Sequence, residues 1–537
     1  MNAPASRFIF LVILATMVTS LFSFASCGDD DDDDTSSTSV DDDSDDDTGD
    51  DDTNADDDTV DDDTGDDDTG DEKALPWLRA VNGDAPAIVD ELGRQVILRG
   101  ANFNHLGDYF ETHPTLPTVA PLTEDDWEDA AAQGMNVVRL VTTWSAWEPE
   151  RDQYSEEYLQ RVRDAVAQAA AHDMYVVIDM HQDAWSKFVF TPAEETCPEG
   201  TSHQRGWDGA PEWATYTDGE PTCTPGRRED SPAVKKAWEN FYDNREGIQD
   251  ELIELWGRIA AEFADEPTVA GYDLLNEPGN GPKFFGTMQQ LADFYRGAID
   301  AIRAAESAAG SQGHIVFFET SVTAAPPTFD FQEDNTVFAP HNYFESIISG
   351  PEGLLDIGFF LFDLLGSFYK TPVWVGEYNY FGDAETGDAW MTRYAALDDQ
   401  FLQSGGTWWQ WEQECGDPHN SQWPPSQEWL EQQQEKCGNA RFQIRACSDR
   451  GYPRAAPGRL TFLSAVPCDG ELIVEGTTGK AGTADLWMPA YSDEDPQVRG
   501  EGLGETVITS VKGGWRITVE VNGEYKIRVI PSPDELP

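Results

Sequence analysis

Two glutamates, Glu277 and Glu377, are the residues of this chain whose setting most clearly suggests chemistry. Each ends a short apolar run and is followed at once by a loop sequence, in segments 271–281 and 372–382. Such runs are typical of buried parallel strands, and catalytic groups are expected where barrel strands end. A structural ion pair would explain one such Glu. Two carboxylates facing one cleft instead favour the acid/base and the nucleophile that cleave a glycosidic bond.

Other polar and aromatic residues end the same predicted strands, and we interpret them as substrate-binding: Arg139, His181, Asp183, Asn276, His341, Tyr343, Trp409 and Trp411. A nearby arginine and a tyrosine hydroxyl can keep a nucleophilic carboxylate ionised. The acid, in contrast, needs a raised pKa so that it can protonate the leaving oxygen. Asn276 can hydrogen-bond the sugar 2-hydroxyl, and the tryptophans can form a platform for a sugar ring. Singly, each residue also has a structural explanation, such as a core histidine or a salt-bridged arginine.

The elements that must position these residues alternate between apolar runs and amphipathic segments, which predicts an α/β fold with one (β/α)8 TIM barrel. The predicted strands are 96–102, 135–140, 175–181, 269–277, 314–319, 337–343, 373–378 and 406–411. The predicted helices are 123–133, 156–172, 235–264 and 284–305. The interval 182–234, rich in Gly, Pro, Trp and Cys, predicts a large loop over the active-site face.

The two ends of the chain differ in character from the barrel, so we divide the sequence into four parts: 1–27, 28–73, 74–451 and 452–537. The last part contains short β-rich runs separated by Gly and Asn, which predict a small β-sandwich. Within it, Asn522-Gly523 predicts a hairpin turn.

The first two parts predict export. Arg7 and the apolar run 8–24 form a signal peptide, and the following Ala-Ser-Cys27 resembles a lipobox, so that Cys27 would carry a lipid anchor. Phe24 stands where that pattern has Leu, which leaves simple cleavage and secretion as the alternative. Residues 28–73 contain 25 Asp and almost no apolar residues. They predict a disordered, extended tether at the cell envelope.

Charge and cysteine content limit the possible partners. The net charge is −68 and the Asp-rich tether accounts for only about 25 units of it, which argues against a nucleic-acid partner. Six cysteines remain besides Cys27, and an even number in an exported chain predicts disulfides. They are Cys197, Cys223, Cys415, Cys437, Cys447 and Cys468. None of them forms a CxxC pair, which argues against a zinc site. Disulfides between neighbouring cysteines (197–223, 415–437, 447–468) are favoured, although the sequence does not fix the connectivity.

The motifs around the two glutamates resemble glycoside hydrolase family 5, with Asn-Glu-Pro on strand four and Glu on strand seven. The resemblance implies a retaining β-glycosidase without metal or organic cofactor, in which Glu277 is the acid/base and Glu377 the nucleophile. It also implies that the two glutamates are supported by Arg139, His181, Asn276, His341 and Tyr343.

Within that family the chain is most similar to the endoglycoceramidases, which release the intact glycan from ceramide. The likeness runs from about residue 90 to the end and rests on 137–140, 147–149, 179–183 and 452–455. It implies that Asp183 contacts the sugar. Segment 102–110 lacks the lysine those enzymes use for the same purpose, and loop 182–234 is longer, so the glycan is left open.

Segment 354–369 is apolar almost all round, which predicts either contact with an acyl chain or membrane surface, or an ordinary barrel helix. The expected partners are therefore a glycolipid or oligosaccharide and a membrane surface, and we expect a monomer. Two alternatives keep the enzyme but change the substrate: a β-glucanase, or a β-glucosidase of glucosylceramide or steryl glucosides. A surface carbohydrate-binding protein is a third, which the intact glutamate pair disfavours.

Overall fold

The computed structural model describes residues 74–281, 284–348, 350, 353–381, 384–419, 440–441, 449–465, 467 and 470–531. The signal peptide, the tether and three of the cysteines (Cys437, Cys447 and Cys468) lie outside these ranges, so the predictions about them stay predictions. No helix in the described ranges is long and apolar enough to cross a membrane.

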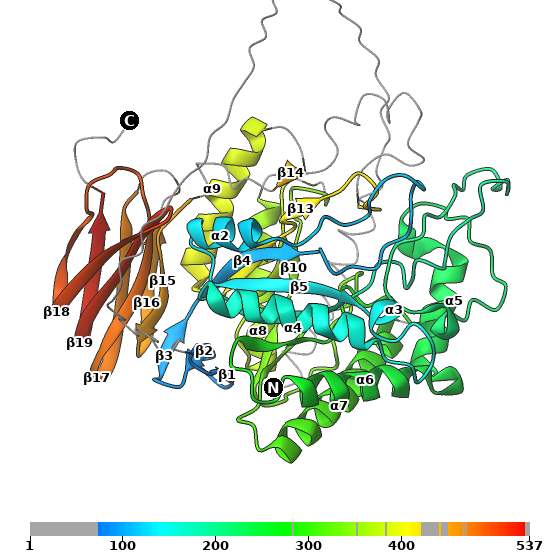
Figure 1. The fold of residues 1–537 in the computed structure, drawn as a ribbon, viewed down its shortest axis with the longest axis horizontal. Coiled ribbons are helices and arrows are strands. Elements are labelled where there is room, and N and C mark those ends of the chain that lie inside the picture. Colours follow the sequence, from blue (N-terminus) through cyan, green and yellow to red (C-terminus); the bar gives the residue numbers. More distant parts are fainter. Residues whose placement is uncertain are drawn as a thin grey trace, which may run out of the picture.

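A ring of parallel strands forms the centre of the molecule (Figure 1). In chain order they are β4 (Leu98–Phe103), β5 (Val137–Thr143), β6 (Tyr175–His181), β7 (Val269–Asp273), β8 (Ile315–Phe318), β9 (Thr336–Phe338), β10 (His341–Asn342), β11 (Val375–Tyr378) and β12 (Gly405–Trp408). β9 and β10 are two pieces of one barrel strand, interrupted before Pro340. Because β9 pairs with β8 and β10 with β11, the ring closes. The predicted TIM barrel and its strands are confirmed.

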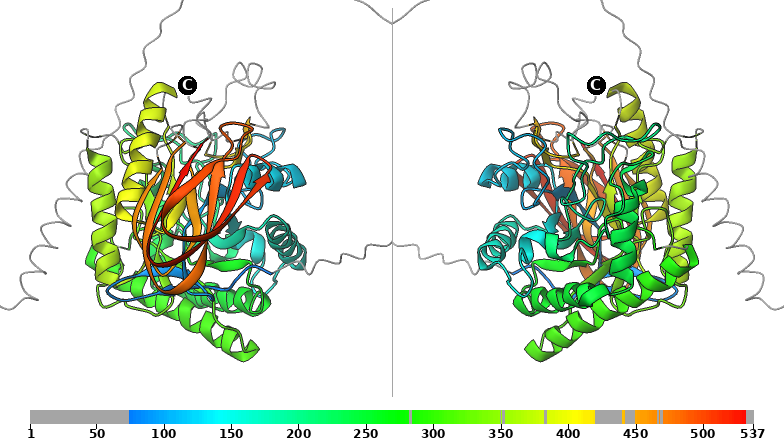
Figure 2. Two further views of the ribbon diagram at one scale, coloured as in Figure 1. Left: turned by 90° about the vertical axis from the view of Figure 1, so that its left-hand side faces the viewer. Right: turned by 90° about the vertical axis from the view of Figure 1, so that its right-hand side faces the viewer.

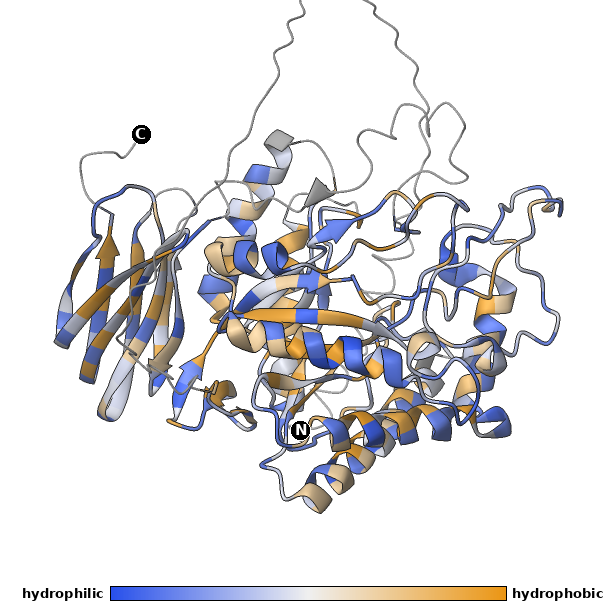
Figure 3. Ribbon diagram, in the orientation of Figure 1, coloured by the Kyte–Doolittle hydropathy of each residue, from blue (hydrophilic) through white to orange (hydrophobic). Residues whose placement is uncertain are grey.

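Helices connect these strands: α2 (Glu124–Ala132), α3 (Trp144–Trp147), α4 (Glu156–Ala171), α5 (Pro232–Tyr242), α6 (Ile248–Glu262), α7 (Phe284–Ala309), α8 (Leu354–Tyr369) and α9 (Ala384–Phe401). Figure 3 shows mainly hydrophobic residues along β5 and alternating polar and apolar residues along α4, as expected for a core strand and a surface helix. The expectation of one helix over 235–264 was wrong. Asn244, Glu246 and Gly247 have left-handed φ angles of 51°, 51° and 82°, which end α5 and restart the chain as α6.

Helix α8 behaves mostly as an ordinary barrel helix. Leu355, Phe359 and Tyr369 are buried against the barrel, whereas Ile357 and Phe360 are 44% and 50% exposed. The exposed apolar surface predicted for this segment is therefore limited to these two side chains.

The C-terminal strands β15 (Tyr452–Pro457), β16 (Arg459–Ala465), β17 (Leu472–Pro489), β18 (Gln497–Val511) and β19 (Gly514–Ile530) form an antiparallel sheet, extended by the N-terminal strands β1 (Leu78–Val81), β2 (Ala87–Asp90) and β3 (Arg94–Val96). The first half of β17 pairs with β16 and the second half with β15, so the sheet folds over a shared apolar core as a sandwich (Figure 2). The predicted Asn522-Gly523 hairpin was wrong. Both residues lie inside β19, where a register shift against β18 lets the long strand bend.

Polar contacts fix the sandwich against the barrel. The Tyr452 hydroxyl donates to Gly134 O at 2.7 Å, and Arg454 Nη2 donates to Asp173 O at 2.6 Å. Beside them, Arg450 bridges Asp398 and Asp399 of α9, the pair that also holds Arg99 of β4. The sandwich therefore supports the barrel on the side of β4 and β5.

Candidate active site

Arg139 of β5 is the hub of the site and is fully buried. Its guanidinium donates hydrogen bonds of 2.8–3.1 Å to Asn102, Asp179, Asp273, Asn276 and Glu377. These partners come from four other barrel strands or their ends (β4, β6, β7 and β11), so one side chain ties the carboxyl ends of the barrel together. Burial raises the pKa of Asp179 to about 7, although the charge of Arg139 opposes that change.

Glu377, at the end of β11, receives two strong donors. Arg139 Nη1 donates to its Oε1 at 2.8 Å and the Tyr343 hydroxyl donates to its Oε2 at 2.7 Å. Burial and the charges of both glutamates hold the pKa of Tyr343 well above its usual value, so this hydroxyl remains a donor. The two donors hold the Glu377 carboxylate in one orientation, as a nucleophile at this position requires.

Glu277 follows β7 on an unusual backbone, with a φ of 34°. Gln182 Nε2 holds this turn by donating to the carbonyl oxygens of Asn276 and Glu277 at 2.8 and 2.9 Å, and Asn276 Nδ2 donates back to Gln182 O at 3.1 Å. A non-glycine residue in this region is a strained position of the kind found at functional sites. The surrounding hydrogen bonds therefore fix the direction of the Glu277 side chain.

The pKa expected for Glu277 does not agree with the structure. Burial raises this pKa, but the hydrogen bond and charge of His341, followed by the charge of Arg228, outweigh burial and lower it below its usual value. Arg228 Nη2 lies 3.4 Å from Glu277 Oε2 and belongs to loop 182–234. The expectation of a raised pKa was wrong because His341 hydrogen-bonds the carboxylate and, as a smaller effect, this loop places the cation of Arg228 beside it.

His341 of β10 joins the two glutamates. Its Nδ1 lies 3.1 Å from Glu277 Oε1 and 3.4 Å from Glu377 Oε2. One carboxylate oxygen from each glutamate and a ring nitrogen of His341 lie within 4.8 Å of one another. Retaining glycosidases hold their carboxyl groups about 5–5.5 Å apart, whereas inverting enzymes need about 6.5–9.5 Å for a water molecule. The spacing fits the retaining geometry.

Glu319, at the end of β8, was missed in the sequence. It is 3% exposed, its Oε2 accepts the Glu277 backbone N–H at 3.2 Å, and its Oε1 lies 3.2 Å from His341 Nε2. Burial raises its pKa to about 8, while the charge of His341 opposes the change. Its place at the end of a predicted strand was the available signal.

A second part of the site is built from loops around His181 and Asp183. His181 stacks on Trp409 with ring centroids 5.0 Å apart and an interplanar angle of 11°. Burial lowers its pKa to about 3. Asp183 accepts a hydrogen bond from Arg228 Nη1 at 2.7 Å and lies 2.6 Å from His419 Nε2. Sequence reasoning missed Arg228 and His419, because neither ends a strand.

Trp411 does not join the site. It is 1% exposed, stacks on Phe103 and donates its indole N–H to Asp126 Oδ1 of α2 at 3.1 Å. The structure thus places Trp411 in the core between the barrel and α2, and not among the substrate-binding residues.

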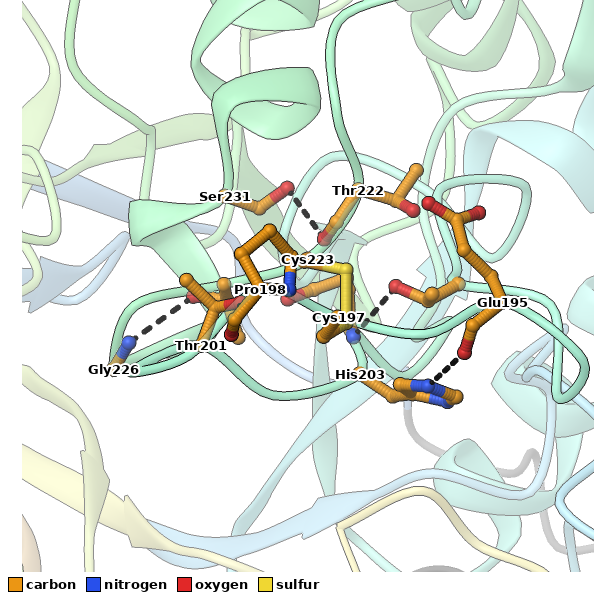
Figure 4. Close-up of a disulfide and its surroundings, with 12 residues drawn as sticks. Glu195, Cys197, Pro198, Thr201, His203, Thr222, Cys223, Gly226 and Ser231 are labelled. Atoms are coloured by element: carbon orange, nitrogen blue, oxygen red, sulfur yellow. Dashed lines mark hydrogen bonds between the residues drawn. A yellow bond between two sulfur atoms is a disulfide. The ribbon is translucent and has the colours of Figure 1, made fainter.

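A disulfide closes the large loop on itself. Cys197 and Cys223 are bonded, as predicted, next to a pair of 2.9 Å backbone hydrogen bonds between Ser202 and Thr224. In Figure 4, Ser231 also donates to Thr222 O, at 3.0 Å, close to the start of α5. Cys415 is disulfide-bonded as well, and the pairing of the remaining cysteines falls outside the described ranges.

Comparison with known proteins shows which family has this site. The profile described as "Cellulase (glycosyl hydrolase family 5)" matches residues 89–415. A crystal structure of an endogalactoceramidase is 38% identical and superposes with a TM-score of 0.75, covering 85% of this chain and 100% of that one.

Two curated relatives point in the same direction. Endoglycoceramidase I of Rhodococcus hoagii is 30% identical over 50% of this chain and 53% of its own length. The endoglycoceramidase of Hydra vulgaris is 27% identical over 49% and 55%. The chain spans about half the length of these curated relatives, whereas the family profile matches well over half of this chain. The protein therefore belongs to glycosyl hydrolase family 5.

Proposed function

We propose that this protein is a retaining endo-β-glycosidase that hydrolyses the bond between glycan and ceramide in glycosphingolipids. The observation that carries the reaction type is the close approach of Glu277 and Glu377, within 4.8 Å around His341. The names of the relatives, endoglycoceramidase and endogalactoceramidase, support the substrate class.

The reaction proceeds by double displacement. Glu377 Oε attacks the anomeric carbon while Glu277 gives its proton to the ceramide oxygen, so that the glycosidic bond breaks as the glycosyl ester forms. Glu277 then removes a proton from water, which attacks the same carbon and frees Glu377. Arg139 and Tyr343 hold the nucleophile in place during both steps.

Glu277 must be neutral for the first step, although its pKa is lowered in the unliganded site. The contact with Arg228 is long, 3.4 Å, and Arg228 also pairs with Asp183. Protonation of the acid therefore requires that the bound substrate weaken the contacts of His341 and Arg228 with Glu277.

Exposed apolar residues near Tyr343 favour a lipid as the group attached to the glycan. Phe381 and Ile347 are 51% and 58% exposed. Phe381 packs beside Tyr343, with ring centroids 5.9 Å apart, and its backbone N–H donates to Ser346 Oγ. Tyr343 donates a hydrogen bond to the nucleophile Glu377, and apolar side chains beside it suit the hydrocarbon chains of ceramide better than a second sugar. This arrangement favours a glycolipid over a β-glucan as the substrate.

Export and anchoring complete the proposal. Cys27 carries a lipid at the bacterial cell envelope and residues 28–73 are the tether, which lets a monomeric enzyme reach substrate at a membrane surface. Replacing Cys27 with Ala should release the protein into the medium. Retention of this variant in the membrane fraction would remove the anchor from the account.

The decisive experiment incubates the full-length protein in detergent with a ganglioside that carries a fluorescent ceramide. Free ceramide and an intact glycan are expected, and Glu377→Ala should abolish both. Glu306→Gln is the matched control. Glu306 is also a buried glutamate that pairs with a histidine, His314, but it lies at the other end of the barrel strands, before β8 begins. It should retain activity.

Parallel incubations with soluble β-glucan and glucosylceramide separate the alternatives. Reducing sugar from glucan with the ganglioside intact would keep the mechanism and exclude the lipid. Inactivity of the folded protein on every substrate would favour a carbohydrate-binding protein.

A further inference from the structure

The double displacement gives no task to Glu319, at the end of β8, although this side chain contacts both the acid and the histidine beside it. The carboxyl group is buried. Its Oε2 accepts the backbone N–H of Glu277 at 3.2 Å, and its Oε1 lies 3.2 Å from His341 Nε2 and 3.5 Å from Arg139 Nη2. The peptide N–H and the guanidinium keep their hydrogen atoms, so His341 is the one of these three partners with which Glu319 can exchange a proton.

His341 lies between Glu319 and Glu277, with one ring nitrogen toward each carboxyl group. Its Nδ1 is 3.1 Å from Glu277 Oε1. Its Nε2 is buried, makes no well-aligned hydrogen bond to any described residue, and faces Glu319 Oε1. An imidazole can take up a proton at one nitrogen while it releases a proton from the other. The three side chains therefore form a continuous path from a buried carboxyl group to the acid.

Protons are held tightly along this path. Burial raises the pKa of Glu319 to about 8, although the charge of His341 opposes the change. Burial lowers the pKa of His341, but the charges of Glu319 and Glu377 outweigh burial and hold that pKa well above its usual value. Neighbours of this kind titrate as a pair. At neutral pH the pair therefore keeps a proton beside Glu277, whose own pKa is lowered.

The other charged or titratable groups around Glu319 do not compete for this proton. Arg139 stays charged, and Tyr295 of α7 donates its hydroxyl to the backbone oxygen of Glu319 at 3.2 Å. Asp273 of β7, whose charge raises the pKa of Glu319, accepts a hydrogen bond from Arg139 at 2.9 Å. Glu377, the further carboxylate beside the histidine, accepts one at 2.8 Å. The exchange is thus limited to the three side chains of the path.

We propose that Glu319 is a positioning residue that shares one proton with His341 and supplies it to Glu277 through the imidazole ring. The shared proton, between Glu319 Oε1 and His341 Nε2, settles on Nε2 as the Nδ1 proton passes to Glu277 Oε1. The ring is then neutral, Glu319 is ionised and Glu277 is the neutral acid. Nδ1 without its proton no longer lowers the pKa of Glu277.

The proton balance closes over one turnover. The leaving oxygen takes the proton from Glu277 in the first displacement. The proton that Glu277 removes from water in the second displacement returns along the same path to the pair of His341 and Glu319. The inference rests on the proposed function, and it accounts for an acid that is neutral in the reaction although its pKa is lowered in the unliganded site.

Glu319→Gln tests the inference, because the amide keeps the shape and an acceptor for the Glu277 N–H but cannot hold the proton. With the fluorescent ganglioside, the basic limb of kcat/KM against pH should move to lower pH by about one unit, so that activity above the limb falls about tenfold. With a dinitrophenyl β-lactoside, whose leaving group needs no proton, the variant should match the wild type. Glu306→Gln, at a buried glutamate beside another histidine, should leave the limb in place.

A second readout needs no substrate. In protein with ¹⁵N-labelled histidine, NMR should show that His341 loses its charge at higher pH in the wild type than in Glu319→Gln, because the charge of Glu319 raises the His341 pKa. In Glu306→Gln, His341 should titrate as in the wild type. Inactivity of the wild type on every substrate would count against the proposed function, and this titration would still decide the inference.

Three results would overturn the inference. One is a wild-type His341 that titrates at or below the usual histidine pKa of about 6.5, which needs no variant. Another is a His341 titration or a basic limb that Glu319→Gln leaves unchanged. The third is an equal loss of activity on the ganglioside and the dinitrophenyl substrate, because Glu319 would then only support the fold.

Discussion

The site consists of a strand-built half and a loop-built half, and the two are constructed differently. In the strand-built half, Arg139, His341, Tyr343 and Glu377 extend from or adjoin barrel strands and contact one another directly. In the loop-built half, Asp183 depends on Arg228 and His419, which arrive from distant segments. Under the proposed function, the reaction rests on the barrel strands, whereas recognition of the glycan rests on loops, which tolerate changes in sequence better than strands do.

The strongest test of this contrast is Arg139→Met. The change leaves Asp179, Asp273 and Glu377 without their shared buried cation. Unpaired buried charges of this kind typically cost about 3–5 kcal/mol, so we expect a loss of that size in the free energy of unfolding, measured with urea, together with loss of activity.

Arg516→Met is the matched control. Arg516 pairs with Asp485 and Asp173 at the partly exposed edge of the sandwich, where a pair contributes about 1 kcal/mol or less. Equal destabilisation by the two variants would show that the strand-built half has no special dependence on its buried arginine.

A smaller effect is expected when both Cys197 and Cys223 are changed to Ser. Opening a loop whose ends are 26 residues apart removes about 3.5 kcal/mol at most in the chain-entropy account. The loss should fall on the loop-built half. Steady-state kinetics should therefore show a raised KM with kcat nearly unchanged, and the reverse pattern would contradict the division into halves.

The smallest effect should come from Arg228→Gln. Arg228 connects the two halves, because it pairs with Asp183 and also contacts Glu277. Removing this cation raises the pKa of Glu277, because Arg228 is one of the groups that lower it. Since the acid must be protonated, the basic limb of the profile of kcat/KM against pH should move upward, by about one pH unit. Lys187→Gln, a control on the same loop paired with Asp108, should leave the limb in place. A downward shift in Arg228→Gln would mean that Glu277 is not the acid.

The two halves also differ in how far the sequence predicts them. Apolar strands that end in Glu277 or Glu377 signal both the barrel and the position of the proposed catalytic pair, because strand periodicity and the loop after each strand are local features. Glu319 had the same local signal. It was missed because nothing adjacent in the sequence shows its contact with the Glu277 backbone.

The remaining failures concern contacts between distant segments. Arg228 lies 49 positions from Glu277 and His419 lies 236 from Asp183, and no periodicity encodes such meetings. Trp411 shows the converse: its place on a predicted strand suggested the cleft, but packing against Phe103 and α2 took it into the core. The break between α5 and α6 depends on three left-handed residues, of which Asn244 and Gly247 are usual signals and Glu246 is not.

Covalent labelling tests the central claim, that Glu377 is the nucleophile of a retaining mechanism, most directly. The protein is incubated with a 2-deoxy-2-fluoro-β-lactoside that has a good leaving group, digested, and examined by peptide mass spectrometry. The account predicts loss of activity with one fluoro-lactosyl group per chain, on the peptide containing Glu377, and no label in Glu377→Ala. A stable label on Glu277 or on any other residue would contradict it.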